Sequence, residues 1–414
     1  MDRVNLGEYG HFAAGVSLRI LGILVSLASA IVTARGLGVD GRGLLVTCTS
    51  AAQIGAQILA LGMPSAVVLA VARRPALGRQ AARRGLAAAA GAGLIALLLA
   101  GLLFRWHPPG WLNPAVISLS PLVAGLVAAQ VLLWWCSSLT QALGAVDRLP
   151  LIETSYRVIS VLWSGVALFY LRLPFAPFLG SLIAVDAICG IAWIAGVRRL
   201  APDSAPEAAW PREWWAWSLK AYFPLALNSG LRRMDAPLLT GIAGLRATGI
   251  YSIGAQVMDT CQVAPIFLGQ KAMYAFSTGR EDGGWLRRLR RWLPGVVFAL
   301  MVLAGLTARF WAGFLFGSEF SGAGPVILVL APGAAALAWE TVAVQEINAS
   351  GFPLQLTMVW LVCFGLAAGL LLALIPPFGA LGAAAAISAA HLALAVMVHR
   401  LRGKIRKAGK PEAQ

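Results

Sequence analysis

Charged side chains are scarce in this sequence. Asp, Glu, Lys and Arg make up only 12% of its 414 residues, whereas they make up about 25% of an average soluble domain. Hydrophobic residues account for 59%, and the mean hydropathy is +0.77. This composition excludes an ordinary soluble domain, and apolar stretches of about 20 residues, the length needed to cross a bilayer, recur from end to end.

The sequence also lacks the motifs of common enzyme classes. It contains no GxxxxGK[ST] phosphate loop, no HExxH, no GxSxG and no dinucleotide fingerprint. Its five cysteines and four histidines show neither a CxxC pair nor metal-ligand spacing. We therefore expect no enzymatic activity, no cofactor and no metal site.

Apolar windows predict an all-α polytopic membrane protein of about twelve transmembrane helices. The expected spans are residues 11-34, 44-72, 85-104, 115-144, 150-171, 175-197, 218-242, 248-275, 292-315, 323-347, 353-375 and 377-399. Because the number is even, both termini should lie on one side of the membrane.

Basic residues predict which side that is. The net charge of +16 is concentrated in two loops and in the C-terminal tail, without the aromatic and basic face of a nucleic-acid-binding protein. The residues are Arg73, Arg74, Arg79, Arg83 and Arg84, then Arg280, Arg287, Arg288, Arg290 and Arg291, and finally Arg400, Arg402, Lys404, Arg406, Lys407 and Lys410. Cytoplasmic loops carry an excess of Lys and Arg, so both termini are predicted to be cytoplasmic.

A proline-containing polar linker divides the chain near its middle. It runs from Arg198 to Glu213 and predicts an N-terminal six-helix bundle over residues 1-204 and a C-terminal one over 205-414, which ends in a short basic tail. Four tryptophans at the end of this linker and just after it are expected to anchor a helix at the level of the lipid headgroups: Trp210, Trp214, Trp215 and Trp217.

The two halves resemble each other weakly. The segment ARGLGVDGRGLL aligns with TGIAGLRATGIY at a constant offset of 206 residues, which pairs Gly38 with Gly244 and Gly43 with Gly249. Six spans per repeat give both copies the same orientation, so the repeat axis should run along the membrane normal. Two facing pseudo-symmetric bundles would enclose a central cavity.

Three charged residues lie near the middle of the seventh span. An ionisable group inside a span is costly unless it faces a partner, a bundle interior or water. Arg232, Arg233 and Asp235 could form an ion pair that fixes helix packing, or could line an aqueous cavity that binds an anion. Because one acid cannot neutralise both arginines, we favour the cavity, and guanidinium groups suit a diphosphate.

Other charges inside spans could line the same space. Arg19 and Arg157 would extend a basic path from the cytoplasmic side. Asp186, Glu340 and Asp259 are candidates for cation coupling. Asp186 and Glu340 are nearly mid-span, where a carboxyl group could bind and release a proton or could simply be a buried acid hydrogen-bonded to its neighbours.

Several segments resemble polysaccharide biosynthesis flippases, including O-antigen flippases, of the multidrug, oligosaccharidyl-lipid and polysaccharide (MOP) exporter superfamily. The run RRMDAPLLTGIAGLRATGIYSIGAQV, from Arg232 to Val257, is similar to the seventh-to-eighth span signature of that family. The segments ARGLGVDGRG, LGMPSAVV and FGSEFSGAGPVILVLAPG support the same resemblance.

The resemblance implies a V-shaped, MATE-like arrangement with a cationic cavity for an undecaprenyl-diphosphate-linked oligosaccharide, an O-antigen or exopolysaccharide repeat unit. It implies alternating access in the bacterial inner membrane, with Arg232, Arg233, Asp235 and Arg19 at positions where the family has charged residues. Expected partners are the lipid-linked substrate and membrane lipids, with a polysaccharide polymerase and chain-length proteins as further candidates.

Three alternatives remain. A cation-coupled multidrug antiporter of the same superfamily would favour acidic residues and cationic substrates. A membrane enzyme acting on lipid-linked sugars would usually need a large loop or domain outside the membrane. A scaffold for polysaccharide assembly would not require charges in the middle of a span.

Overall fold

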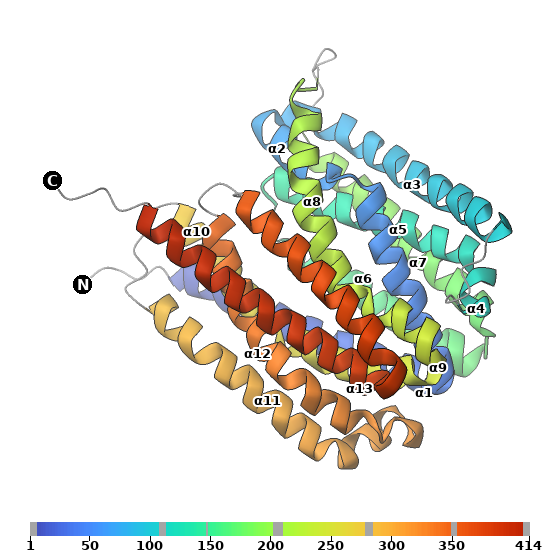
Figure 1. Cartoon of the computed structure of the whole chain (residues 1–414). Coiled ribbons are helices and arrows are strands. Elements are labelled where there is room, and N and C mark those ends of the chain that lie inside the picture. Colours follow the sequence, from blue (N-terminus) through green and yellow to red (C-terminus); the bar gives the residue numbers. More distant parts are fainter. Residues whose placement is uncertain are drawn as a thin grey trace. The chain divides into compact units, whose positions relative to one another are not determined.

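The protein is described by a computed structural model that covers residues 6–106, 113–145, 148–201, 210–277, 285–348 and 354–408. Within these ranges the chain forms helices and turns and no β-strand (Figure 1). The predicted all-α class is therefore confirmed.

Seven helical segments are long and apolar enough to cross a membrane. They are Leu21–Leu59, Pro75–Phe104, Ser120–Ala142, Phe175–Leu200, Arg288–Phe316, Ala323–Asn348 and Leu354–Ile405. The first and last contain 39 and 52 residues, well beyond the 20 or so that one crossing needs. Each bends at a glycine with non-helical backbone angles, Gly38 or Gly379. Each thus accounts for two predicted spans. We expected a loop at Gly38, whereas Gly379 lies within the predicted span 377-399.

The other three predicted spans fall on interrupted helices. The fifth changes from α6 (Leu149–Gly165) to a π-helical turn, η3 (Val166–Tyr170). The seventh and eighth are divided among α8 (Trp214–Arg233), α9 (Asp235–Cys261) and α10 (Val263–Ser277), with breaks at Met234 and Gln262. Helices α8 and α9 contain 20 and 27 residues, which is long enough for one crossing, but each carries three charged residues and is therefore less apolar than the seven segments above.

The chain divides into two compact units. The first contains Met1–Leu37, Cys48–Gly110 and Pro114–Ala226, and the second contains Gly38–Thr47, Trp111–Asn113 and Leu227–Gln414. The sequence placed the boundary between halves at residue 204, whereas in the structure the division falls within α8.

Helix α5 is central to the first unit, where α2, α3 and α7 pack against it and α6 packs against α7. The buried Trp135 of α5 donates its indole N–H to the Ala81 carbonyl over 2.9 Å. A Cβ on Gly85 would lie 2.4 Å from the Trp135 ring, so the close approach of α3 requires a glycine there. The helices are α1 (Leu6–Leu59), α2 (Met63–Arg73), α3 (Gly78–Trp106), α4 (Pro114–Ser118), α5 (Ser120–Ala142), α6, α7 (Phe175–Leu200) and the start of α8 (Trp214–Arg233).

Helix α12 is central to the second unit, where α9, α10, α11 and α13 pack against it. It is rich in alanine and glycine, small residues that let helix backbones approach closely. On α13, Ser388 donates its hydroxyl to the Val329 carbonyl of α12 over 2.6 Å. This close packing positions the next turns of α12 and α13 for the polar contact described below. The helices are α9 (Asp235–Cys261), α10 (Val263–Ser277), α11 (Trp285–Phe316), α12 (Ala323–Asn348) and α13 (Leu354–Ala408).

The two glycines paired by the sequence repeat share one unusual backbone conformation. Gly38 has φ 69° and ψ −176°, and Gly244 has φ 88° and ψ 175°. Backbone angles in this region of φ/ψ space are essentially restricted to glycine. Equivalent positions of the two segments therefore bend the chain in the same way, which supports the internal repeat.

The second glycine pair makes a reciprocal contact within the second unit. A Cβ on Gly43 would lie 2.1 Å from the Leu245 carbonyl oxygen, and one on Gly249 would lie 2.1 Å from the Val39 carbonyl oxygen. Leu245 and Val39 are themselves 206 residues apart. The repeat thus packs against its own copy at a site where neither glycine can carry a side chain without displacement.

Tryptophans after the linker pack on arginines of the first basic loop, within the first unit. The Arg84 guanidinium lies 4.4 Å from the centre of the Trp210 ring, and that of Arg73 lies 4.7 Å from Trp217. Such cation–π contacts suit aromatic and basic side chains at a headgroup layer.

Candidate functional site

The two central arginines occupy a helix end. Helix α8 ends at Arg233, the chain is interrupted at Met234, and α9 begins at Asp235. Cationic groups are favourable at a helix C-terminus and anionic groups at a helix N-terminus, because of the partial charges of the backbone. The interruption therefore stabilises Arg232 and Arg233 on one side of the break and Asp235 on the other.

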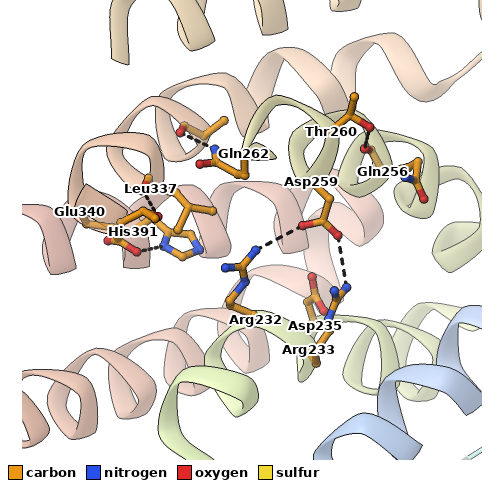
Figure 2. Close-up of polar contacts among 12 residues, drawn as sticks. Arg232, Arg233, Asp235, Gln256, Asp259, Thr260, Gln262, Leu337, Glu340 and His391 are labelled. Carbon is orange, nitrogen blue, oxygen red and sulfur yellow. Dashed lines mark hydrogen bonds and ion pairs between the residues drawn. The ribbon is translucent and has the colours of Figure 1, made fainter. Parts of the chain in front are cut away.

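A single carboxylate contacts both arginines. Asp259 of α9 lies 3.5 Å from an Arg232 nitrogen and 3.4 Å from an Arg233 nitrogen (Figure 2). The three side chains retain 27%, 35% and 39% of their surface. Among these three side chains, two positive groups share one negative group, and all three keep part of their surface exposed.

Asp235 is held differently from the arginines with which the sequence groups it. It is buried, accepts the Tyr251 hydroxyl over 2.5 Å and accepts the backbone N–H of Ala236 over 2.8 Å. The acid that contacts the arginines is instead Asp259, which the sequence suggests only as a candidate for cation coupling. Asp235 thus fastens the start of α9 to the part of α9 that follows the kink at Gly244.

A second polar pair lies between α12 and α13. Glu340 and His391 are each 1% exposed, and the His391 Nδ1 lies 3.1 Å from the Glu340 Oε1 (Figure 2). The other carboxyl oxygen, Oε2, is buried and has no hydrogen-bond partner among the described residues.

The remaining predicted site residues belong to the first unit. Asp186 of α7 accepts a hydrogen bond of 2.9 Å from the Ser160 hydroxyl of α6. Arg157 is exposed on α6. Arg19 lies in α1, but its side chain falls outside the described part of the structure. Within the second unit, the structure brings together Arg232, Arg233 and Asp259.

A further network joins the ends of three helices in the second unit. Glu346 of α12 contacts Arg290 of α11, and its Oε2 lies 2.6 Å from the Arg402 Nε of α13. These side chains are 7% to 13% exposed. Two arginines around one acid fasten the basic end of α13 to the rest of the unit.

The sequence analysis did not identify two of these partners, His391 and Tyr251. His391 lies alone in an alanine-rich apolar run, and this position indicates that its side chain needs a buried partner. Tyr251 carries no such signal, because tyrosine is ordinary within a span. Among the described residues, no three His, Cys, Asp or Glu side chains form a metal-binding group.

These observations define an all-α, multi-pass membrane protein whose spans contain charged residues. Neither a protein-family model nor a curated protein sequence matches the chain. Solved structures do share its fold.

The chain has the fold of transporters of the MOP superfamily. One similar structure is an inward-facing multidrug resistance MATE family transporter, with a TM-score of 0.71, 13% identity, and 96% of this chain and 99% of that chain covered. Another is the lipid II flippase MurJ in an inward closed conformation, with a TM-score of 0.66, 12% identity, and coverage of 94% and 87%.

A third similar structure is a MOP superfamily transporter from Pyrococcus furiosus, described as having a binding pocket of reverse polarity. Its TM-score is 0.60, its identity is 14%, and coverage is 95% and 96%. The expected architecture of about twelve helices is thus confirmed, while the predicted O-antigen flippase family is a finer assignment than these matches make.

Proposed function

We propose that this protein is a flippase that moves an undecaprenyl-diphosphate-linked oligosaccharide across the bacterial inner membrane by alternating access. The observation that carries the proposal is the sharing of one carboxylate, Asp259, by Arg232 and Arg233 within an apolar region. The excess positive charge would attract an anion. A diphosphate supplies several oxygens that planar guanidinium groups bind in pairs.

The fold supports the broader part of this proposal, that the protein is a transporter or flippase. The similar structures include both a lipid II flippase and MATE transporters, so the fold is compatible with a lipid-linked substrate and with a small drug. The choice between these substrates therefore depends on the charge of this chain's own site.

The test is a translocation assay in liposomes that contain a fluorescent undecaprenyl-diphosphate oligosaccharide. Wild type should move the lipid to the opposite leaflet, and Arg232→Ala or Arg233→Ala should slow it roughly tenfold or more, because charge-assisted hydrogen bonds contribute about 1.5–3 kcal/mol each. Arg246→Ala is the matched control, since Arg246 is 60% exposed and pairs with Glu319 in the same unit. No movement by wild type with several sugars and ion gradients, or equal loss in the control, would argue against the proposal.

One observation favours the second candidate, a cation-coupled multidrug antiporter. Asp259 keeps 39% of its side-chain surface, so this carboxylate could meet a cationic drug. Transport of a lipophilic cation by wild type, abolished in Asp259→Asn and unaffected in Arg232→Ala, would establish that alternative.

A further inference from the structure

One side of helix α6, in the first unit, is polar along most of its length. At about 100° per residue, Glu153, Arg157 and Ser160 fall within roughly 60° of arc around the helix axis. Arg157 is exposed, and Glu153 and Ser160 are partly buried. These three residues are called the α6 polar face below.

The opposite side of α6 is apolar. Leu151, Ile159 and Leu162 lie there, with 54%, 49% and 65% of their surface exposed. Ser155 shares this side, but its hydroxyl donates to the Leu151 carbonyl of its own helix over 2.8 Å. The apolar side suits contact with lipid. An exposed Arg157 on the other side of the same span then requires water there, because an ionisable group facing lipid is costly.

Two other helices of the first unit add polar groups to this face. On α7, the partly buried Asp186 accepts a hydrogen bond of 2.9 Å from the Ser160 hydroxyl. On α5, the Ser137 hydroxyl lies 3.5 Å from the Glu153 Oε1. These contacts hold the side chains in place. A carboxylate accepts up to about four hydrogen bonds, so Asp186 can accept more than the one from Ser160.

The mixture of charges on this face points to a ligand rich in hydroxyl groups. Glu153 and Asp186 would repel an anion, and Arg157 would repel a cation. A sugar hydroxyl can donate to a carboxylate and accept from a guanidinium or a serine hydroxyl, so a sugar satisfies all of these groups. Trp163, on the next turn of α6, is partly exposed, and its indole N–H is already hydrogen-bonded within the first unit over 3.0 Å. Its ring is therefore suited to cover the C–H face of a sugar.

We propose that the α6 polar face, together with Asp186, binds the sugar part of the lipid-linked substrate. This inference rests on the proposed function, in which Arg232 and Arg233 bind the diphosphate, and it assigns the sugar to residues of the first unit. A site that hydrogen-bonds a substrate hydroxyl discriminates against a ligand without that hydroxyl, because the polar groups of the site are then left without a partner. The face would therefore make the protein selective for glycosylated lipids over other polyprenyl diphosphates.

The first test measures whether the polar face meets water. Single cysteines are introduced in a background without the five native cysteines, and the protein is kept in membranes. Ser160→Cys should react with a small water-soluble methanethiosulfonate at least roughly tenfold faster than Leu162→Cys, which lies on the apolar side. Equal rates at the two positions would overturn the proposal.

The second test compares two kinds of ligand by calorimetry of the purified protein in detergent. The diphosphate probe is the methyl ester of a short-chain polyprenyl diphosphate. The glycan probes carry different neutral trisaccharides in place of the methyl group. Because all of these probes have the same charge, a difference in affinity reports the sugar. Wild type should bind at least one glycan probe roughly tenfold more tightly than the diphosphate probe.

Variants assign that difference to the polar face. Ser160→Ala and Asp186→Asn should each weaken binding of that glycan probe roughly three- to tenfold, the loss expected for one hydrogen bond, and leave binding of the diphosphate probe unchanged. Ser155→Ala is the matched control, because it removes the same group from the opposite side of the same helix. It should bind both probes as wild type does.

The outcomes separate this inference from the proposed function. If wild type binds neither kind of probe, the proposed function fails. If wild type binds every glycan probe no more tightly than the diphosphate probe, or if the two variants weaken both kinds of probe equally or neither, the sugar site is overturned while the flippase assignment stands. If Asp186→Asn does not elute as a folded protein, Ser160→Ala and the cysteine labelling still decide the matter.

Discussion

The two candidate substrate classes, a lipid-linked diphosphate and a cationic drug, predict opposite effects on binding when Asp259 is substituted. It holds both arginines by contacts of 3.4 and 3.5 Å. Replacing it with asparagine removes the competing negative charge and frees donor groups of Arg232 and Arg233 for an anion. We expect Asp259→Asn to bind the diphosphate probe roughly two- to tenfold more tightly than wild type, measured by calorimetry at low salt.

A cationic substrate would lose affinity in the same variant. Asp40→Asn serves as the control, because Asp40 is an exposed acid of the second unit outside this cluster. Weaker binding of the diphosphate in Asp259→Asn would show that the aspartate positions the arginines rather than competes with the ligand.

Tyr251 provides a test of stability at a single hydroxyl. It is 2% exposed, and its hydroxyl donates to the buried Asp235 over 2.5 Å. Tyr251→Phe leaves that carboxyl group with one partner fewer, at a cost of about 1–3 kcal/mol. The midpoint of thermal unfolding in detergent should fall, whereas Tyr170→Phe, at a side chain that is 83% exposed, should leave it within about 1 °C. Equal midpoints for Tyr251→Phe and wild type would mean that this hydrogen bond adds no net stability.

The positions of the central charges could be predicted from the sequence, but their partners could not. Arg232 and Arg233 stand out because arginine is rare inside a span. Asp235 seemed the natural partner of Arg232 at a helical spacing of three residues, but the chain breaks at Met234 and Tyr251 binds the aspartate instead. The actual partner, Asp259, lies 27 residues beyond Arg232 on the next helix, and no local spacing indicates such a contact.

At the scale of elements, the reciprocal glycine contact is the sharpest constraint. A Cβ on Gly249 would lie 2.1 Å from a backbone oxygen, which cannot move as a flexible side chain would. Gly249→Ala should therefore lower the midpoint of thermal unfolding by roughly 5 °C, since overpacking costs about 1–3 kcal/mol.

The matched control for that change is Gly369→Ala on α13. A Cβ at Gly369 meets no atom within 4 Å, and alanine is the better helix former. This variant should be as stable as wild type or slightly more stable. A Gly249→Ala protein as stable as the Gly369→Ala protein would contradict the close packing of the two repeat segments.

The internal repeat shows which features of the helices could be predicted from the sequence and which could not. The offset of 206 residues paired Gly38 with Gly244, and both have the same glycine-specific backbone angles. Hydropathy alone, however, predicted loops at these glycines, because it registers the drop in apolar character and not the direction of the backbone. At both glycines the backbone angles are non-helical, so two helices meet there at a kink.

At the scale of the whole molecule, the 12% of charged residues predicted a membrane protein, and the apolar windows predicted about twelve helical spans, because backbone polar groups inside a bilayer must be hydrogen-bonded within the protein. The substrate is not specified at that scale. Similar folds belong to a lipid II flippase and to multidrug transporters, so the difference between them must come from a few side chains, such as the two arginines and one aspartate of α8 and α9.

The charge distribution predicts the orientation of the chain, and this prediction can be tested directly. Gln80, in the first turn of α3, and Ser318, between α11 and α12, are both exposed, and the positive-inside rule assigns them to opposite sides of the membrane. In a background without the five native cysteines, Gln80→Cys should react with a membrane-impermeant maleimide only in inverted inner-membrane vesicles. Ser318→Cys should react in intact spheroplasts. The reverse pattern would place both termini outside the cytoplasm, and the arginine cluster would then have to take up its anion from the other side of the membrane.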